Sequence, residues 1–423
     1  MAMPAAPAPA DPPGRPVAHP PPWVALTASE RGASHVAMQT PNQDSVAVER
    51  AGPNGLVAAV ADGHGHSRHL RSARGSRFAV GIGCRVGQEV ADQLIARAPG
   101  LAEAETGSAG PAGPGSAITA EEIIDLVQDF LIPSVVGRWR EAVLADVAAD
   151  PFTESEHDQR RPGDDPTIAY GSTLLLCVAL REWLILAQIG DGDVVGVRAD
   201  GTATLPVPAD PQLDGLVTTS LCGPDAAADF RIGVVNITQT PLLATLLATD
   251  GYGNAQVAER WPDSFSKDMA WLLRERDTRW LASQLPGWAA RCASAEGSAD
   301  DTTVALLISP AGQASRTITP PGGGGAGGAA SEAGGQAERD ADEITIPAVP
   351  RADTVPSGQV PSRHGPDGPA APTEPITVRL ATQAAAGQPE PGPVAGEPPV
   401  PGITDQVTAE WDPPGRSAGS GVR

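Results

Sequence analysis

Short apolar runs alternate with longer amphipathic stretches through the middle of the chain. Runs rich in valine, leucine and alanine predict β-strands at 23–29, 44–50, 55–62, 172–180, 182–190, 193–200, 230–238, 241–250 and 301–309. Apolar residues at helical spacing predict α-helices over 71–98, over 120–148 and twice within 254–296. Because very short turns separate the strands between 172 and 200, we expect antiparallel hairpins there. This order of elements predicts an α+β fold with helices packed on antiparallel sheets.

The two ends of the chain lack such patterns. Residues 1–21 are rich in proline and alanine, and residues 311–423 in proline and glycine, as is an insert at about 105–118. Such segments bury too little apolar surface to offset their chain entropy, so we expect all three to be disordered. Residues 22–310 then form one domain. The long C-terminal tail is a candidate tether for a signalling partner.

Composition narrows the classes of function. The 423 residues carry a formal net charge of −22, and an acidic protein repels nucleic-acid backbones and anionic lipid, so we expect neither as a partner. The N-terminus does not look like a signal peptide, and no apolar run has the length of a membrane span. The cysteines form no C-x-x-C pair and indicate small core residues in a reducing compartment. We therefore expect a cytoplasmic protein; the cysteines are Cys84, Cys177, Cys222 and Cys292.

Aspartates stand at the ends of several predicted strands. Asp62, Asp191 and Asp250 each follow a strand and precede a glycine, Asp300 precedes the last strand, and Asp44 opens an early one. Any single Asp-Gly pair is also typical of an ordinary turn. If the strand ends converge, however, the carboxylates would form a site for Mg²⁺ or Mn²⁺, which prefer oxygen ligands. Spacing alone does not show that they converge.

Five motifs in one order carry a resemblance to a known family. They are NQDSVAV at 42–48, VADGHG at 60–65, GSTLLLCVAL through IGDGDVVGV at 171–197, LLATDGYGN at 246–254 and ADDTTVALL at 299–307. In this order they resemble the metal-dependent protein phosphatases of the 2C (PPM) type, and most closely a bacterial branch. The resemblance implies a sandwich of two antiparallel β-sheets flanked by pairs of α-helices.

The resemblance also implies a metal centre of two Mn²⁺ or Mg²⁺ ions, with a weaker third. Asp62 would bridge the two ions together with the carbonyl of Gly63. Asp250 and Asp300 would complete the shell of the first ion, and Asp301 would take the place of the family's asparagine. Asp44 would support the second ion, and Asp191 the third.

The implied reaction is hydrolysis of phosphoserine or phosphothreonine in proteins, without a covalent phosphoenzyme. His64 would protonate the leaving group, since the ordinary pKa of histidine lies near working pH. The substrates would be those of a bacterial serine/threonine kinase. The chain departs from the family at Gln43, where a glutamate is common, and at Gln39, where a phosphate-binding arginine is usual. The arginines that could replace the latter are Arg68, Arg71 and Arg74.

Two other interpretations remain open. His64, His66 and His69 have the spacing H-x-H-x-x-H of metallo-β-lactamase-like zinc hydrolases, although Arg68 stands where that motif requires an aspartate. Alternatively, the neutral residues Gln39 and Gln43 favour a catalytically weak phosphatase-like module that acts as a sensor or scaffold.

Overall fold

A computed structural model describes residues 23–101, 118–211, 218–257 and 260–315. The expected N-terminal tail, all but the last residue of the expected insert, and the C-terminal tail from residue 316 lie outside these residues.

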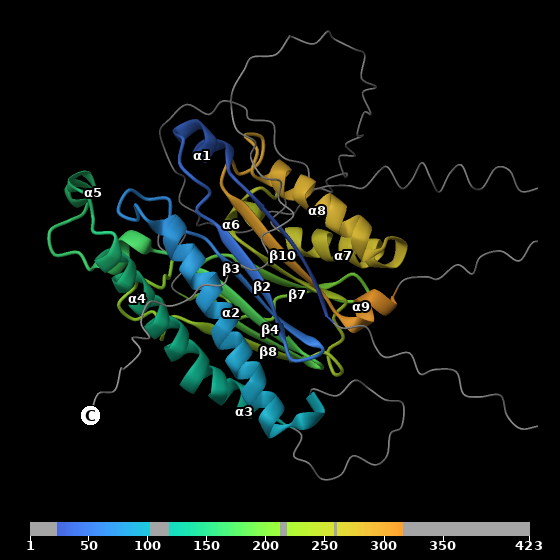
Figure 1. The fold of residues 1–423 in the computed structure, drawn as a ribbon. Coiled ribbons are helices and arrows are strands. Elements are labelled where there is room, and N and C mark those ends of the chain that lie inside the picture. Colours follow the sequence, from blue (N-terminus) through green and yellow to red (C-terminus); the bar gives the residue numbers. More distant parts are fainter. Residues whose placement is uncertain (1–22, 102–117, 212–217, 258–259, 316–423) are drawn as a thin grey trace, which may run out of the picture. The chain divides into compact units, whose positions relative to one another are not determined.

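The described strands form two antiparallel sheets of five strands each (Figure 1). The first has the order β1-β10-β9-β6-β7 and the second β2-β3-β4-β5-β8. Their bounds are β1 Val24–Glu30, β2 Ser45–Ala51, β3 Gly55–Ala61, β4 Leu174–Leu180, β5 Trp183–Ile189, β6 Asp193–Val197, β7 Ala203–Thr204, β8 Arg231–Asn236, β9 Ala244–Ala248 and β10 Thr302–Ile308.

Helices cover the outer face of each sheet (Figure 1). Helices α2 and α4 lie against the second sheet, and α7 and α8 against the first. The remaining helices are short. The bounds are α1 Ala33–Met38, α2 Ser72–Arg97, α3 Ala120–Leu126, α4 Ile132–Ala149, α5 Glu154–Gln159, α6 Asp250–Asn254, α7 Trp261–Glu275, α8 Thr278–Cys292 and α9 Pro310–Ala314. This is the predicted α+β sandwich.

The core between the sheets explains the apolar runs. Strands β3, β4 and β5 are buried along their whole length, since one face meets helices and the other meets the opposite sheet. Leu175 of β4 and Leu186 of β5 share a cluster with Leu247 of β9 and Leu307 of β10. Each such side chain contributes about 1.5–3 kcal/mol when it is fully buried.

The predicted helix over 120–148 is interrupted. Helix α3 begins with a capping box between Thr119 and Glu122, and a π-helical turn, Val127–Leu131, separates it from α4. Pro133 stands in the first turn of α4. Because proline lacks a backbone N–H, it cannot continue the hydrogen bonds of the preceding helix, and the ladder is rearranged there.

The expected hairpin between residues 182 and 200 is wrong. Strand β5 pairs with β4 and β8, whereas β6 pairs with β7 and β9 in the other sheet. The chain crosses between the sheets at Gly190, whose φ of +103° disfavours side-chain-bearing residues, and at Gly192. A Cβ on Gly192 would lie 2.6 Å from the carbonyl oxygen of Ala248.

The structure also bears on the expected lack of a membrane span and on the expected burial of the cysteines. In the described part of the chain, no helix is both long enough and apolar enough to cross a membrane. The cysteines are free thiols, and Cys84, Cys177 and Cys292 are buried as predicted. Cys222 is only partly buried and lines the pocket described below.

Candidate active site

A pocket of about 830 Å³ opens where several strands end. Asp62 follows β3, Asp191 follows β5, Asp250 follows β9, and Asp300 precedes β10; all four line the pocket. Because β9 and β10 are antiparallel neighbours, the end of one lies beside the start of the other. The structure thus brings together the aspartates that the sequence could not place relative to one another.

The Asp62–Gly63 turn is held by backbone contacts from two other motifs. The amide of Asp62 donates to Thr173 Oγ1 (2.9 Å), and the amide of Thr173 donates to the Asp62 carbonyl (2.8 Å). The amide of Gly63 donates to the Gln43 carbonyl (3.1 Å). A Cβ on Gly63 would lie 2.7 Å from the carbonyl oxygens of Gln43 and Ser72, so only glycine fits this crossing.

Burial and mutual repulsion raise the pKa values of these carboxyls. Burial, followed by the charges of Asp44, Asp250, Asp300 and Asp191, holds the pKa of Asp62 well above its usual range. Burial and the same kind of repulsion raise the pKa of Asp250 to about 6. A bound cation would offset both the burial of the charged carboxylates and their mutual repulsion.

Asp44 lies behind the pocket, only 8% exposed. Its Oδ2 accepts a hydrogen bond from Thr249 Oγ1 (2.8 Å), whereas the buried Oδ1 has no hydrogen-bond partner among the described residues. The buried Oε1 of Gln43 is likewise unpartnered within that part of the chain. Buried oxygens without donors are uncommon in proteins, and here they suit a cation.

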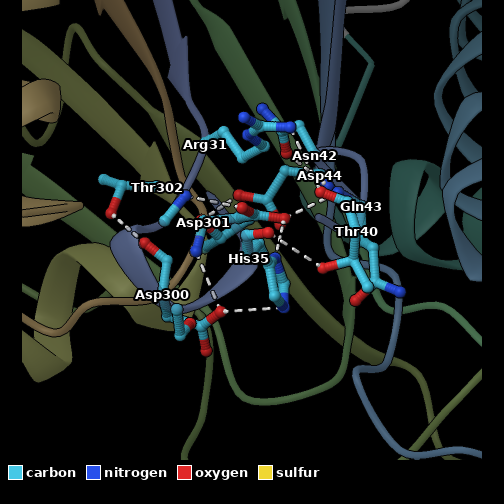
Figure 2. A network of polar contacts seen from close by, with 12 residues as sticks. Arg31, His35, Thr40, Asn42, Gln43, Asp44, Asp300, Asp301 and Thr302 are labelled. Atoms are coloured by element: carbon cyan, nitrogen blue, oxygen red, sulfur yellow. Dashed lines mark hydrogen bonds and ion pairs between the residues drawn. The ribbon is translucent and has the colours of Figure 1, made fainter. Parts of the chain in front are cut away.

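The adjacent side chains of Asp300 and Asp301 have different surroundings. The carboxylate of Asp300 lines the pocket and is 49% exposed. That of Asp301 is 3% exposed and accepts the amides of Gly32 (2.7 Å) and Gln43 (2.6 Å) (Figure 2). Asp301 therefore ties the start of β10 to the segment before β2.

His64 also lines the pocket, with its Nε2 2.7 Å from Ser220 Oγ. Burial, and then the neighbouring His69, lower its pKa to about 4. His69 directs Nδ1 at the carbonyl of Ile168 (2.5 Å), and His66 is exposed. The three histidines therefore do not aim at one point.

Across the described ranges, no three histidine, cysteine, aspartate or glutamate side chains stand close enough to hold an ion as they are placed. For the histidines, Ser220 and the Ile168 carbonyl already engage two of the rings.

Of the three candidate phosphate-binding arginines, the structure places only Arg68 at the pocket. Its Nη2 contacts Asp164 (3.1 Å). Arg71 is buried among Glu156, Tyr170 and the Asp150 carbonyl, and Arg74 pairs with Asp146 and Asp150. The start of α2 thus directs Arg71 and Arg74 toward α4 and α5, away from the carboxylates.

Sequence reasoning missed several residues at the site. Asp193 opens β6, and burial, followed by the charges of Asp250 and Asp191, raises its pKa to about 7. His35 lines the pocket from α1, whereas Gln39 is exposed at the end of that helix. The only signal for Asp193 was the repeated aspartate in IGDGD; the six residues of α1 are too few to show a helical period.

The family model for Protein phosphatase 2C matches residues 31–288. The match covers more than half of the chain, which belongs to the protein phosphatase 2C family, a family whose members depend on metal ions. No curated protein matches the chain.

Several solved structures are similar to this one. The serine/threonine phosphatase Stp1 from Staphylococcus aureus is 13% identical, with a TM-score of 0.42, over 70% of this chain and 98% of that one. PppA, a regulatory component of T6SS in Pseudomonas aeruginosa, is 16% identical, with a TM-score of 0.39, over 68% and 98%. The catalytic domain of PstP, in complex with two manganese ions, is 19% identical, with a TM-score of 0.34, over 68% and 97%.

Proposed function

We propose that the chain hydrolyses phosphoserine and phosphothreonine in proteins in a metal-dependent reaction. One observation carries the proposal: Asp62, Asp250 and Asp300 come from three different strand ends and line one pocket. The raised pKa values of Asp62 and Asp250 support it, because strongly perturbed carboxyls in a cleft are typical of functional sites.

In this proposal Asp62 and the Gly63 carbonyl would hold two Mn²⁺ or Mg²⁺ ions in common. Asp250 and Asp300 would complete the set of ligands of the first ion, Asp44 would support the second, and Asp191 a weaker third. When bound, such ions supply an activated water for in-line attack at phosphorus and offset the charge of the phosphate. The buried, unpartnered oxygen of Asp44 is the observation that best fits a cation behind the pocket.

His64 gives a proton to the leaving serine or threonine oxygen. Its ring is neutral at neutral pH, since its pKa is lowered to about 4. A phosphate dianion beside the ring favours the protonated form and raises that pKa. Ser220 holds Nε2 in the pocket and sets the orientation of the ring.

Arg68 contacts the phosphate in place of the arginine that position 39 lacks. It lines the pocket, and its buried Nε has no hydrogen-bond partner within the described residues. A guanidinium can offer two parallel N–H donors to a phosphate. The substrates are proteins phosphorylated by a bacterial serine/threonine kinase, and the chain after residue 315 tethers the phosphatase to a signalling partner.

The test is hydrolysis of a phosphothreonine peptide and of p-nitrophenyl phosphate with Mn²⁺, Mg²⁺ or EDTA. The wild type should turn over only with metal, and Asp62→Asn and Asp250→Asn should both abolish turnover. His66→Gln, which changes an exposed histidine of the same pocket, is the matched control. Turnover in EDTA, or in either aspartate variant, would contradict the proposal.

One observation favours a second candidate, a phosphopeptide-binding scaffold. Gln43, where the family commonly has an acid, gives the site one carboxylate fewer. A scaffold would bind the phosphothreonine peptide but would not hydrolyse it, whichever metal ion is added. Peptide binding by calorimetry, measured beside turnover, separates the two functions.

A further inference from the structure

His35 lines the pocket and has no part in the proposed reaction. Its helix α1 lies between β1 and β2 and is tied to the loop before β10. Gly32 and Ala33 donate their amides to Asp301 Oδ1 (2.7 Å) and the Ala293 carbonyl (2.8 Å). A Cβ on Gly32 would lie 2.4–2.6 Å from the backbone of residues 299–301. His35 and Asp300 are therefore carried by two segments in direct contact.

The imidazole of His35 is buried between the carboxylates of Asp301 and Asp300 (Figure 2), and both His35 and Asp300 line the pocket. Its side chain is 10% exposed, and Nδ1 lies 2.8 Å from Asp301 Oδ2, an ion pair bent away from hydrogen-bond geometry. Nε2 lies 4.0 Å from Asp300 Oδ1. A Cβ on Gly65 would lie 3.9 Å from the same Nε2. Asp301 itself is fixed by two backbone amides.

We propose that His35 is a metal ligand, whose Nε2 shares one divalent ion with the carboxylate of Asp300. The inference rests on the metal-dependent function proposed above. A carboxylate behind the second ring nitrogen is the usual support of a metal-binding histidine, because it fixes the ring and raises its basicity. Asp301, anchored by two amides, places a carboxylate oxygen 2.8 Å from Nδ1, and a rotation of the ring on metal binding would make this contact the supporting hydrogen bond.

The 4.0 Å separation between Nε2 and Asp300 Oδ1 supports this role. It is too long for a hydrogen bond. An ion bound by both groups at about 2.1 Å from each would fit within this gap. Gln43 Oε1 would lie 3.6 Å from the same Cβ on Gly65. A second possible metal ligand, also without a hydrogen-bond partner within the described residues, therefore lies near Gly65 as His35 does.

The ligand set has a chemical consequence. An imidazole beside carboxylates suits transition ions such as Mn²⁺ better than Mg²⁺, which keeps to oxygen ligands. The imidazole of His35 also adds a metal ligand without adding negative charge. It does so near Gln43, which stands where the family commonly has an acid. The chain should therefore discriminate against Mg²⁺ more strongly with His35 than without it.

The experiment uses the full chain loaded with Mn²⁺ and labelled with either ¹⁴N- or ¹⁵N-histidine. Pulsed electron paramagnetic resonance should show a ligand-nitrogen coupling that changes with the label. His35→Gln should remove this coupling and weaken Mn²⁺ binding, measured by calorimetry, by at least about tenfold. His66→Gln should change neither, and Asp301→Asn should weaken binding but keep the coupling.

Two results would overturn the assignment: no nitrogen coupling in the wild type, or a coupling that survives in His35→Gln. Loss of inorganic-phosphate binding in His35→Gln without a nitrogen coupling would place the imidazole on the phosphate instead. If His35→Gln does not fold, a variant with glutamine at 64, 66 and 69 leaves His35 as the only histidine of the pocket. The coupling must persist there, and its loss contradicts the proposal.

Turnover of the phosphothreonine peptide on the same samples separates this inference from the function on which it rests. Turnover without a nitrogen coupling rejects the role of His35 and keeps the phosphatase. A coupling without turnover keeps the metal site and rejects the phosphatase.

Discussion

Two clusters of buried charge lie on either side of the segment from Asp62 to Arg74. In the first, the carboxyls of Asp62 and Asp250 are buried beside one another, and their pKa values are raised. In the second, Arg71 binds Glu156 through two hydrogen bonds (2.8 and 2.9 Å), and this lowers the pKa of Glu156 to about 2. Burial raises the pKa of the carboxyl in both clusters, and the direction of the net shift depends on whether the neighbour is another carboxylate or a guanidinium.

The difference separates a structural cluster from a functional one. Arg71 and Glu156 satisfy each other, so their charges stabilise the packing of α2 on α5 and leave nothing for a ligand. In the proposed function the aspartate cluster would take a cation from outside, and without one its carboxyls are buried beside like charges. Between these two clusters, the direction of the pKa shift distinguishes the mutually repelling carboxyls from the paired one.

The largest expected effect comes from Asp62→Asn. We expect turnover with Mn²⁺ to fall at least about 1,000-fold, as when a principal catalytic group is lost. The free energy of unfolding in EDTA should stay the same or rise, because the variant removes a carboxyl whose pKa is raised by burial. Peptide turnover and urea unfolding check the two parts. A less stable variant in EDTA would mean that Asp62 is a structural residue like Glu156.

Arg71→Ala should have the opposite profile. Removing one partner of a buried ion pair leaves the other uncompensated, so the free energy of unfolding should fall by about 3 kcal/mol. Mn²⁺ affinity of the folded variant should not change. The matched control is Arg138→Ala, whose pair with Glu89 is 42% exposed on both sides and contributes at most about 1 kcal/mol. Equal losses in both variants would remove the distinction between the clusters.

The pH dependence of the metal-free chain should show the aspartate cluster directly. The folded pKa values of Asp250 and Asp193 are about 6 and about 7, above the ordinary 3.8. A raised folded pKa stabilises the protonated form, so this stability is present below pH 3.8 and is lost as pH rises through 6 and 7. Glu156 acts in the opposite direction, losing its contribution between 4.5 and about 2. Urea unfolding in EDTA from pH 4 to 8 measures the slope, and Asp193→Asn should flatten it; a stability that rises over this interval would contradict the cluster.

The same contrast shows how far the sequence could be interpreted. The apolar strands that end in Asp62 and Asp250 carry strong local signals. The pairing of β9 with β10 places Asp250 beside Asp300, whereas Asp62 follows β3 of the other sheet and joins them only through the packing of the two sheets. Strand β6 could not be placed, because its apolar residues suit either sheet and the crossover depends on how Gly192 packs against Ala248.

Side-chain direction was harder to predict than backbone placement. Arg68 and Arg71 lie three residues apart and look alike in the sequence. Their side chains take different directions, since Arg71 pairs with Glu156 and Arg68 with Asp164. Both acids come from a distant polar segment that shows no clear periodicity, so the sequence does not reveal these pairs. His35 escaped notice because Asp301, its partner, is known only from the fold.

The smallest expected effect tests this last point. The sequence offered Arg74 as a phosphate-binding residue, whereas the structure pairs it with Asp146 and Asp150 (both 2.6 Å) at the edge of the arginine cluster. Its side chain is 34% exposed, so Arg74→Gln should cost about 1 kcal/mol or less in urea unfolding. The KM for p-nitrophenyl phosphate should be unchanged, while Arg68→Gln should raise it. A higher KM in Arg74→Gln alone would assign phosphate binding to Arg74, which the structure directs away from the pocket. The separation of the two clusters would then fail.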